Sequence, residues 1–216
     1  MKIAAHQPNF LPNLAFFNKM RLSDLFVVIS NLQFEKQEGW QQRHKIKGLN
    51  NDIWLTVPVF GSQNQKVKDV LINNQADWRK KHIKTLEMIY GKSKGKEYIS
   101  EITSVYKKNW KRLIDLNAEM ILTIRDILNI KTPVVIDEEV SGIKHELLIN
   151  ICKKYKGDIY LSGVGAREYL DETRLNEIKN QGLNHEFVNN NLTAMYPYSS
   201  IHYLFTKGKK WVLDAI

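Results

Sequence analysis

The sequence predicts an α/β fold in which a mostly parallel sheet is flanked by helices. Two observations carry this prediction. Short apolar runs alternate along the chain with longer segments whose apolar residues recur at helical spacing. The clearest run, Leu25–Ile29, is apolar at every position, which is typical of a strand buried on both faces of a parallel sheet.

The first elements are predicted to form a strand–helix–strand unit. Residues 2–5 contain a short apolar run that is typical of a buried strand, and residues 14–22 carry apolar residues at helical spacing. The run Leu25–Ile29 follows directly. A strand, a helix and a second strand joined this tightly are parallel neighbours. Two further strands, bounded by turn-forming residues, are expected at 53–59 and 67–72.

The middle of the chain is predicted to be helical. Asp77 is a typical N-cap residue and Gly91 a typical helix terminator. The last helix of this block has apolar residues along one face. The helices expected here are Trp78–Tyr90, 98–110 and 111–128. We interpret residues 77–130 as a helical insertion or subdomain within a single domain that spans 1–216.

The last third of the chain returns to alternating strands and helices. Strands are expected at 134–136, 157–161 and 184–188. Helices are expected at 143–155, 167–170, 173–181 and 200–205. Because this alternation repeats the pattern of the first elements, the later strands are expected to extend the same sheet.

Composition indicates a cytoplasmic protein with its own core. A chain of 216 residues with 43% apolar content buries roughly 70% of its unfolded surface, so it needs neither disulfides nor a metal to fold. The one cysteine, Cys152, lies in an apolar helical stretch, where an inert thiol in a reducing setting is expected. No signal-peptide pattern is visible, and no apolar run approaches the roughly 20 residues that span a membrane.

The net charge of +9 favours acidic partners, such as phosphate-bearing small molecules, nucleic acid or an anionic membrane face. The same excess also follows from a composition that is simply rich in lysine. The basic segment 107–112, which includes Trp110, has the mixture found in proteins that bind nucleic-acid backbones. No nucleic-acid recognition module is present, however, so a solvated helix face is the favoured interpretation.

Polar side chains follow the first predicted strand where it ends. His6, Gln7 and Asn9 lie in a loop that Pro8 and Pro12 stiffen. In open α/β sheets, ligands bind at the carboxyl ends of the strands. We therefore expect His6, Gln7 and Asn9 to be catalytic, with His6 acting as a general base or as a phosphate ligand. The alternative is that His6 and Asn9 only satisfy backbone groups in turns.

A second polar group follows the second strand and is expected to bind substrate. Its members are Asn31, Gln33, Lys36, Trp40 and Arg43. The two cations suit a phosphate or a carboxylate, and the indole of Trp40 suits stacking on a sugar or a base. A solvated β-hairpin is the alternative for each residue taken alone.

A turn of small residues forms the third group. Tyr160, Ser162 and Gly163 are expected to bind substrate, because backbone N–H groups in a turn between a strand and a helix can hold an anion. Gly163 and Gly165 do not make a dinucleotide fingerprint, since Glu168 stands where its last glycine would be. No metal site is expected, because no cluster of cysteine and histidine has zinc-ligand spacing.

Taken in order, these segments resemble the WbqC-like family of bacterial proteins. The matching segments are His6-Gln-Pro-Asn-Phe-Leu-Pro12, Asp24-Leu-Phe-Val-Val-Ile-Ser-Asn-Leu-Gln-Phe34, Trp40-Gln-Gln-Arg43, Trp54-Leu-Thr-Val-Pro58 and Tyr160-Leu-Ser-Gly-Val-Gly-Ala-Arg-Glu-Tyr-Leu170. The chain departs from the family pattern at Ser30 and Asn31, where an acidic pair is usual, and at Asn13, where an aromatic residue is usual. Members are associated with gene clusters for surface polysaccharides such as O-antigen.

The resemblance implies a transferase that joins an acyl or aminoacyl group, for instance glycyl, to the amine of a nucleotide-linked amino sugar. His6 would take the proton of the amine, while Gln7 and Asn9, together with Gln33, would orient the acyl carbonyl. The donor that the resemblance suggests is a phosphopantetheine thioester on an acyl carrier protein. A phosphate of either substrate would be held by Lys36, Arg43 and the turn at Ser162 and Gly163.

A second resemblance, to Rossmann-like and nucleotidyltransferase-like α/β folds, concerns architecture alone. Those folds carry a HIGH-type loop after the first strand, in which histidines stabilise a phosphate during adenylyl transfer. In this sequence the loop has one histidine, His6, rather than two. Nucleotidyl transfer or ATP-dependent ligation is therefore the second function considered, and non-enzymatic binding of nucleic acid is the third.

Overall fold

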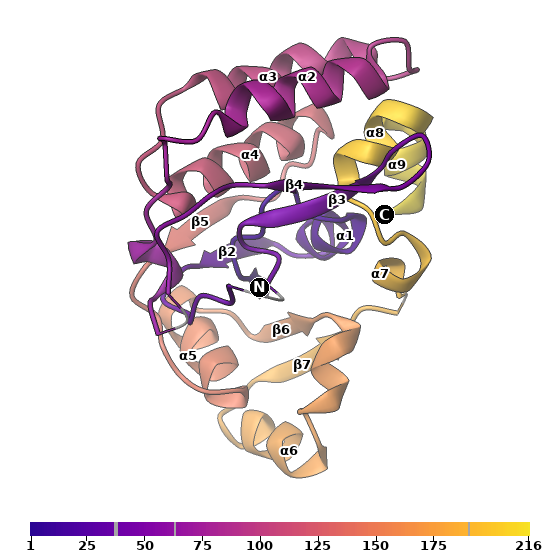
Figure 1. The fold of residues 1–216 in the computed structure, drawn as a ribbon. Coiled ribbons are helices and arrows are strands. Elements are labelled where there is room, and N and C mark those ends of the chain that lie inside the picture. Colours follow the sequence, from indigo (N-terminus) through magenta and orange to yellow (C-terminus); the bar gives the residue numbers. More distant parts are fainter. Residues whose placement is uncertain (37–38, 63, 190) are drawn as a thin grey trace.

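The computed structural model of the chain describes residues 1–36, 39–62, 64–189 and 191–216 (Figure 1). Five strands form a parallel sheet in the order β5-β2-β1-β6-β7. Their bounds are β1 (Lys2–His6), β2 (Leu25–Ile29), β5 (Val134–Asp137), β6 (Ile159–Ser162) and β7 (Asn184–Phe187). The predicted α/β class and its parallel sheet are thereby confirmed.

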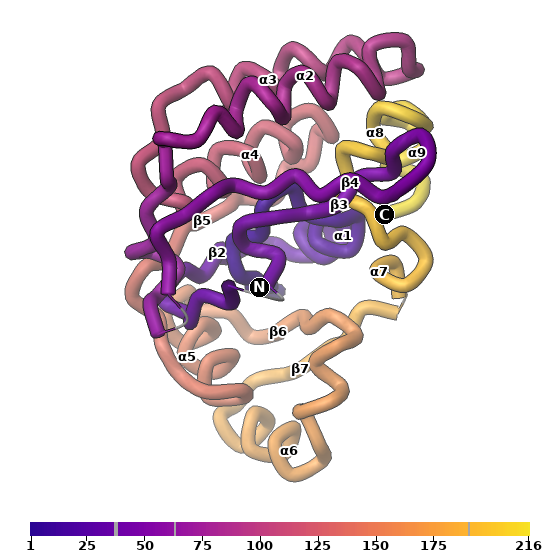
Figure 2. Tube along the Cα trace, in the orientation of Figure 1, coloured from indigo at the N-terminus to yellow at the C-terminus, as the bar shows by residue number. Residues whose placement is uncertain are grey.

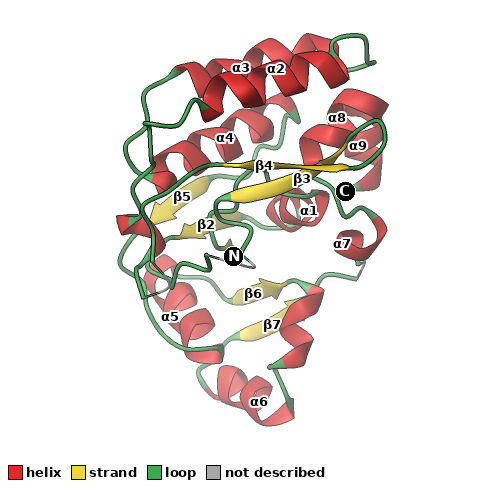
Figure 3. Cartoon of the chain, in the orientation of Figure 1, coloured by secondary structure: helices red, strands yellow, loops and turns green. Residues whose placement is uncertain are grey.

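Helices connect the strands and cover the sheet (Figure 3). The α-helices of the described chain are α1 (Leu14–Arg21), α2 (Trp78–Tyr90), α3 (Ile99–Lys107), α4 (Leu113–Ile127), α5 (His145–Tyr155), α6 (Glu172–Asn180), α7 (Leu192–Met195), α8 (Ser200–Lys207) and α9 (Lys209–Ala215). Asn13 caps the start of α1, and its side chain accepts a hydrogen bond from the backbone N–H of Phe16 at 3.1 Å. Short 3-10 segments lie at η1 (Val67–Asp69), η2 (Lys96–Tyr98) and η3 (Val164–Glu168).

The two faces of the sheet pack against two different cores, because successive strand residues point to opposite sides. Ala4 and Phe26 belong to the larger core, to which α1, α2, α3, α4, α8 and α9 contribute. Ile3 and Val27 belong to the smaller core, to which α5 and α6 contribute. The chain trace shows α2, α3 and α4 stacked on one side of the molecule and α6 beside β7 on the other (Figure 2).

The region between β2 and α2 differs from the sequence-based prediction. The strand expected at 53–59 is the shorter β4 (Asp52–Thr56), which pairs antiparallel with β3 (Arg43–Lys47) in a separate two-stranded sheet. The prediction of a strand at 67–72 is wrong, because this segment begins with the 3-10 helix η1. Its apolar side chains Val67, Val70 and Ile72 are nevertheless buried in the larger core. The apolar run therefore predicted that these side chains are buried, although the backbone that buries them is not a strand.

Several helix limits also differ. The helix expected at 98–110 ends at Lys107, and η3 stands in place of the helix expected at 167–170. Helices α7 and α9 were not predicted. Across the described ranges, no helix combines the length and the apolar character needed to cross a membrane. The helices of the predicted insertion, α2 to α4, bury Leu86, Ile102 and Leu116 in the core that they share with the sheet.

Candidate functional site

A cavity of about 370 Å³ lies at the carboxyl ends of β1 and β6, which are neighbours within the sheet. From β1 the chain continues to β2 on one side, whereas β6 lies on the other side. Connections that diverge in this way leave a crevice at the carboxyl edge, and that crevice is where open α/β sheets bind ligands. The volume falls in the range of small-molecule sites.

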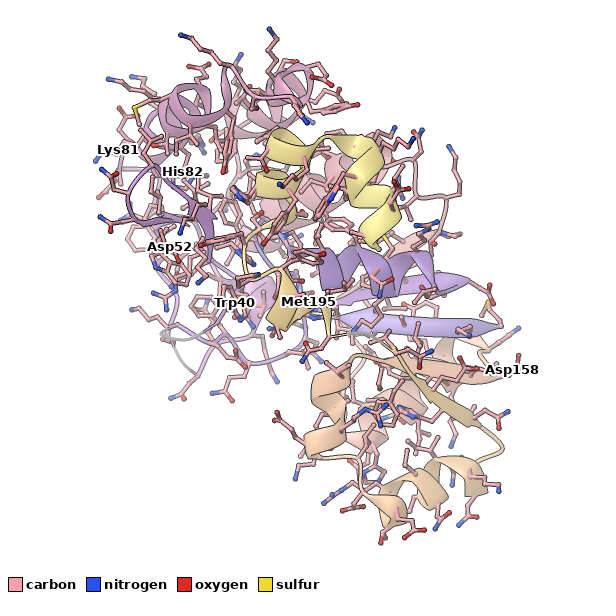
Figure 4. All side chains as sticks on the ribbon, turned by 90° about the vertical axis from the view of Figure 1, so that its right-hand side faces the viewer. Trp40, Asp52, Lys81, His82, Asp158 and Met195 are labelled. Atoms are coloured by element: carbon pink, nitrogen blue, oxygen red, sulfur yellow. The ribbon has the colours of Figure 1, made fainter. Side chains whose placement is uncertain are left out.

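Three segments that are far apart in the sequence meet in this cavity. The residues expected at the site that line it are His6, Gln7, Asn9, Trp40, Tyr160, Ser162 and Gly163. Figure 4 shows Asp158 at the right-hand edge of the molecule and Trp40 near the middle, well to the left of Asp158. Asp158 directly precedes β6, so Trp40 lies toward the end of the sheet where β6 finishes.

Four residues that were expected to bind substrate do not line the cavity. The side-chain amide of Asn31 donates to the carbonyls of Glu139 and Val140 at 3.0 and 3.3 Å. Gln33 lines a separate, smaller hollow. Lys36 is exposed. The guanidinium of Arg43 lies 4.8 Å from the centre of a Trp54 ring. Asn31 therefore contacts the segment after β5, and Arg43 lies on β3 of the separate two-stranded sheet.

The loop after β1 is held in place by buried amides. Gln41 Nε2 donates to Gln7 Oε1 at 2.8 Å, and Gln41 Oε1 accepts from the backbone N–H of Glu35 at 2.8 Å. Asn117 of α4 donates to the carbonyls of Pro8 and Gln41 at 2.6 and 2.7 Å. The loop is therefore held by α4 and by the segment that precedes β3.

His6 is neutral at physiological pH. Burial, with a smaller effect from the nearby charge of Lys19, lowers the pKa of its imidazole to about 3. Its Nδ1 lies 3.0 Å from the carbonyl oxygen of Gln7, which can only accept, so this hydrogen bond requires the proton on Nδ1. Its Nε2 is then an acceptor. The ring also packs edge-to-face on Phe16 at a centroid distance of 5.0 Å.

Lys19 is a cavity residue that sequence reasoning missed. It lies on α1, is 8% exposed, and donates from Nζ to the carbonyl of Ala5 at 2.8 Å. Burial lowers the pKa of its ammonium to about 7. The available signal was a lysine between Phe16 and Met20, on the apolar face of a predicted helix.

Two other features complete the cavity. Asn9 is 9% exposed, and its Oδ1 is buried without a hydrogen-bond partner among the described residues. Thr193 of α7 also lines the cavity and accepts from Asn13 Nδ2 at 3.4 Å. Within the described ranges, no group of three or more histidine, cysteine, aspartate or glutamate side chains is placed to hold a metal ion.

The chain is similar to known proteins over most of its length. It is 31% identical over 183 residues to the uncharacterized protein Rv1507c of Mycobacterium tuberculosis, an alignment that covers 82% of this chain and 78% of that protein. No solved structure matches it. The model of the WbqC-like protein family matches residues 7–208, a span that includes the loop after β1, Lys19 and the turn after β6. The chain therefore belongs to the WbqC-like protein family.

Proposed function

We propose that this cavity transfers an acyl or aminoacyl group to the amine of a nucleotide-linked amino sugar, as a cytoplasmic step in making surface polysaccharides such as O-antigen. The observation that carries the proposal is a buried lysine in the crevice whose pKa is lowered to about 7. Amide formation needs an unprotonated amine as the nucleophile and a nearby group that accepts its proton. A lysine that is about half neutral at pH 7 suits that role.

In this proposal Lys19 is the general base and His6 an orienting group. Overall, the new C–N bond forms at the carbonyl carbon and the C–S bond of a thioester donor breaks. Lys19 Nζ takes the proton that the amine loses, and the thiolate leaves as a thiol, so no net proton is gained or lost. Because the pKa of His6 is lowered to about 3, its Nε2 accepts a hydrogen bond from substrate more readily than a proton.

The remaining cavity residues supply binding contacts for the amino sugar. The unpartnered Oδ1 of Asn9 is a buried acceptor that a sugar hydroxyl or amine can satisfy, which recovers the cost of leaving it unpaired. Trp40 lines the cavity, where an indole suits stacking on a sugar or a base. The net charge of +9 favours a nucleotide-linked acceptor and an acidic acyl carrier protein as the donor.

A product assay tests the proposal. The full chain is incubated with UDP- and dTDP-linked amino sugars and with acyl thioesters of coenzyme A or a carrier protein, and the amide product is sought by mass spectrometry. We expect one acceptor both to raise the unfolding temperature and to be converted. If no acceptor stabilises the protein and no carrier protein binds, the proposal is wrong.

The strand order favours nucleotidyl transfer as a second candidate. The order β5-β2-β1-β6-β7 places the histidine-containing loop directly after the central strand. Lys19 can then neutralise a phosphate instead of accepting a proton. Thermal stabilisation by ATP with Mg²⁺, accompanied by release of pyrophosphate in the presence of a sugar phosphate, would favour this candidate over acyl transfer.

A further inference from the structure

A serine and a histidine are in contact where β6 reaches the cavity. Ser162 is the last residue of β6, is 3% exposed and lines the cavity. His185 lies on the neighbouring strand β7, and its Nε2 is 2.8 Å from Ser162 Oγ. Strands β6 and β7 pair in parallel, with Tyr160 opposite His185. Ser162 lies two residues after Tyr160 and therefore on the same face of the sheet, where the imidazole of His185 reaches it.

The imidazole of His185 is held by its neighbours. It stacks on Tyr160 with an interplanar angle of 15° and meets Phe187 edge-to-face at a centroid distance of 4.5 Å. Burial, together with the positive charge of Arg167, lowers its pKa, so the ring is neutral near pH 7. A neutral imidazole that accepts a hydrogen bond from a serine hydroxyl is the arrangement that activates serine as a nucleophile.

The other candidate nucleophiles and strand-end serines lack this arrangement. Ser30 is also buried and directly follows a strand, but its hydroxyl donates to the carbonyl of Asp137 at 3.3 Å. Cys152 is buried in the smaller core, and burial raises the pKa of its thiol to about 11. Among the described serines, Ser162 has an imidazole nitrogen within hydrogen-bond distance of its Oγ and also lines the cavity.

We propose that Ser162 is a covalent nucleophile that His185 activates, so that the acyl group passes through an ester on Ser162. This inference rests on the proposed acyl transfer and names its path. In the first half, Ser162 Oγ bonds to the carbonyl carbon of an acyl thioester, His185 Nε2 takes the hydroxyl proton, and the C–S bond breaks. The thiolate leaves with that proton.

The second half returns the enzyme to its starting state. The unprotonated amine of the acceptor attacks the ester carbonyl, the C–N bond forms and the C–O bond to Ser162 breaks. The amine proton passes to Lys19 and then, by way of His185, to Ser162 Oγ, so all three side chains return to their starting protonation states. Neither half changes an oxidation state, and the only reactants are the acyl thioester and the acceptor amine.

A fluorophosphonate probe tests the nucleophile without any knowledge of the natural substrates. Attack by an activated serine displaces fluoride and leaves a stable adduct, which peptide mass spectrometry locates. We expect one adduct on the peptide that contains Ser162, none in S162A, and wild-type labelling in the matched control S30A. H185Q keeps a polar side chain but removes the base, and should slow labelling by about 10²–10⁴-fold.

The outcomes separate this inference from the proposed function. Thermal unfolding and circular dichroism first confirm that each variant folds. Labelling at other positions only, or equal labelling of H185Q and wild type, would overturn the nucleophile. Amide formation by S162A at the wild-type rate would also overturn it while leaving acyl transfer intact. Labelled Ser162 without conversion of any amino sugar would instead overturn the proposed acceptor.

Discussion

Two parts of the same sheet edge end in polar residues, but they differ in whether those polar groups are available to bind a ligand. Beyond β2 and β5, the polar groups bind one another: Asp137 accepts from Tyr155 at 2.5 Å, from Lys154 at 2.8 Å and from two backbone N–H groups. Beyond β1 and β6, Asn9 keeps an unpaired acceptor and Lys19 lies in a cavity. Polar strand ends therefore mark a site only where the connections diverge.

The largest expected effect is on turnover at the β1–β6 end. Lys19→Met removes the proposed base while keeping the length and apolar character of the side chain. We expect kcat to fall by about 10²–10⁴-fold with a smaller change in KM. Lys80→Met, at a lysine whose side chain is 85% exposed, is the control and should leave kcat unchanged. Wild-type turnover by Lys19→Met would show that the β1–β6 end has no greater role in turnover than the β2–β5 end.

The β2–β5 end should respond in stability instead. Asp137→Ala leaves the Tyr155 hydroxyl and the backbone N–H groups of Glu139 and Val140 without their acceptor. We expect the free energy of unfolding to fall by about 3 kcal/mol, measured by urea denaturation, with kcat/KM retained at temperatures where the variant is folded. A loss of activity in the folded variant would contradict the division of roles.

Lys19 should also give the stability of the protein a recognisable pH dependence. An unfolded lysine titrates near about 10.4, whereas the pKa of folded Lys19 is about 7. Between these values the unfolded chain binds more protons, so the contribution of Lys19 to the free energy of unfolding rises with pH. The difference between these pKa values corresponds to a cost of about 4–5 kcal/mol below pH 7, and losing the hydrogen bond to the Ala5 carbonyl offsets part of the gain from removing it. Lys19→Met should therefore stabilise the protein by about 2 kcal/mol below pH 7, and this gain should fall and change sign as the pH rises toward about 10. Urea denaturation across this range measures it, and a gain independent of pH would contradict the burial of a charged Lys19.

The smallest expected effect is at Asn31. Asn31→Ala removes the hydrogen bonds to the carbonyls of Glu139 and Val140, which brace the segment after β5. We expect a loss of about 1 kcal/mol in the free energy of unfolding, followed by thermal denaturation, and no change in kcat/KM. A specific rise in KM for the sugar nucleotide would show that the site extends along the edge to β2.

Secondary-structure elements could be predicted from the sequence where a local pattern of residues determines them. The unit β1–α1–β2 follows from apolar runs within 30 residues, and Asp77 and Gly91 bracket α2 as expected. Strand β3 was anticipated only through the β-hairpin alternative, because its five residues carry Arg43, His44, Lys45 and Lys47 around one apolar residue, Ile46. In the segment 67–72, burial was predicted correctly and backbone conformation was not, since apolar periodicity reports only the former.

Individual residues of the candidate site could be predicted from the sequence, but their meeting in one cavity could not. His6 and Ser162 could each be placed at a strand end, but their meeting depends on β1 pairing with β6, which no local pattern specifies. Lys19 was hidden because a lysine on a helix normally reaches solvent. No local pattern marks His185, since its contact with Ser162 exists only through the register of β6 and β7.

The side chain of Asn117 has a consequence for anyone who would shorten this protein. It lies 109 residues from Pro8 in the sequence, yet its amide donates to the Pro8 carbonyl and to that of Gln41. A minimal fragment that retained the sheet but deleted α2 to α4 would therefore lose a clamp on the loop that carries His6 and Asn9. The helical layer and the loop after β1 must therefore be kept together, and moving the cavity to another scaffold requires an equivalent amide.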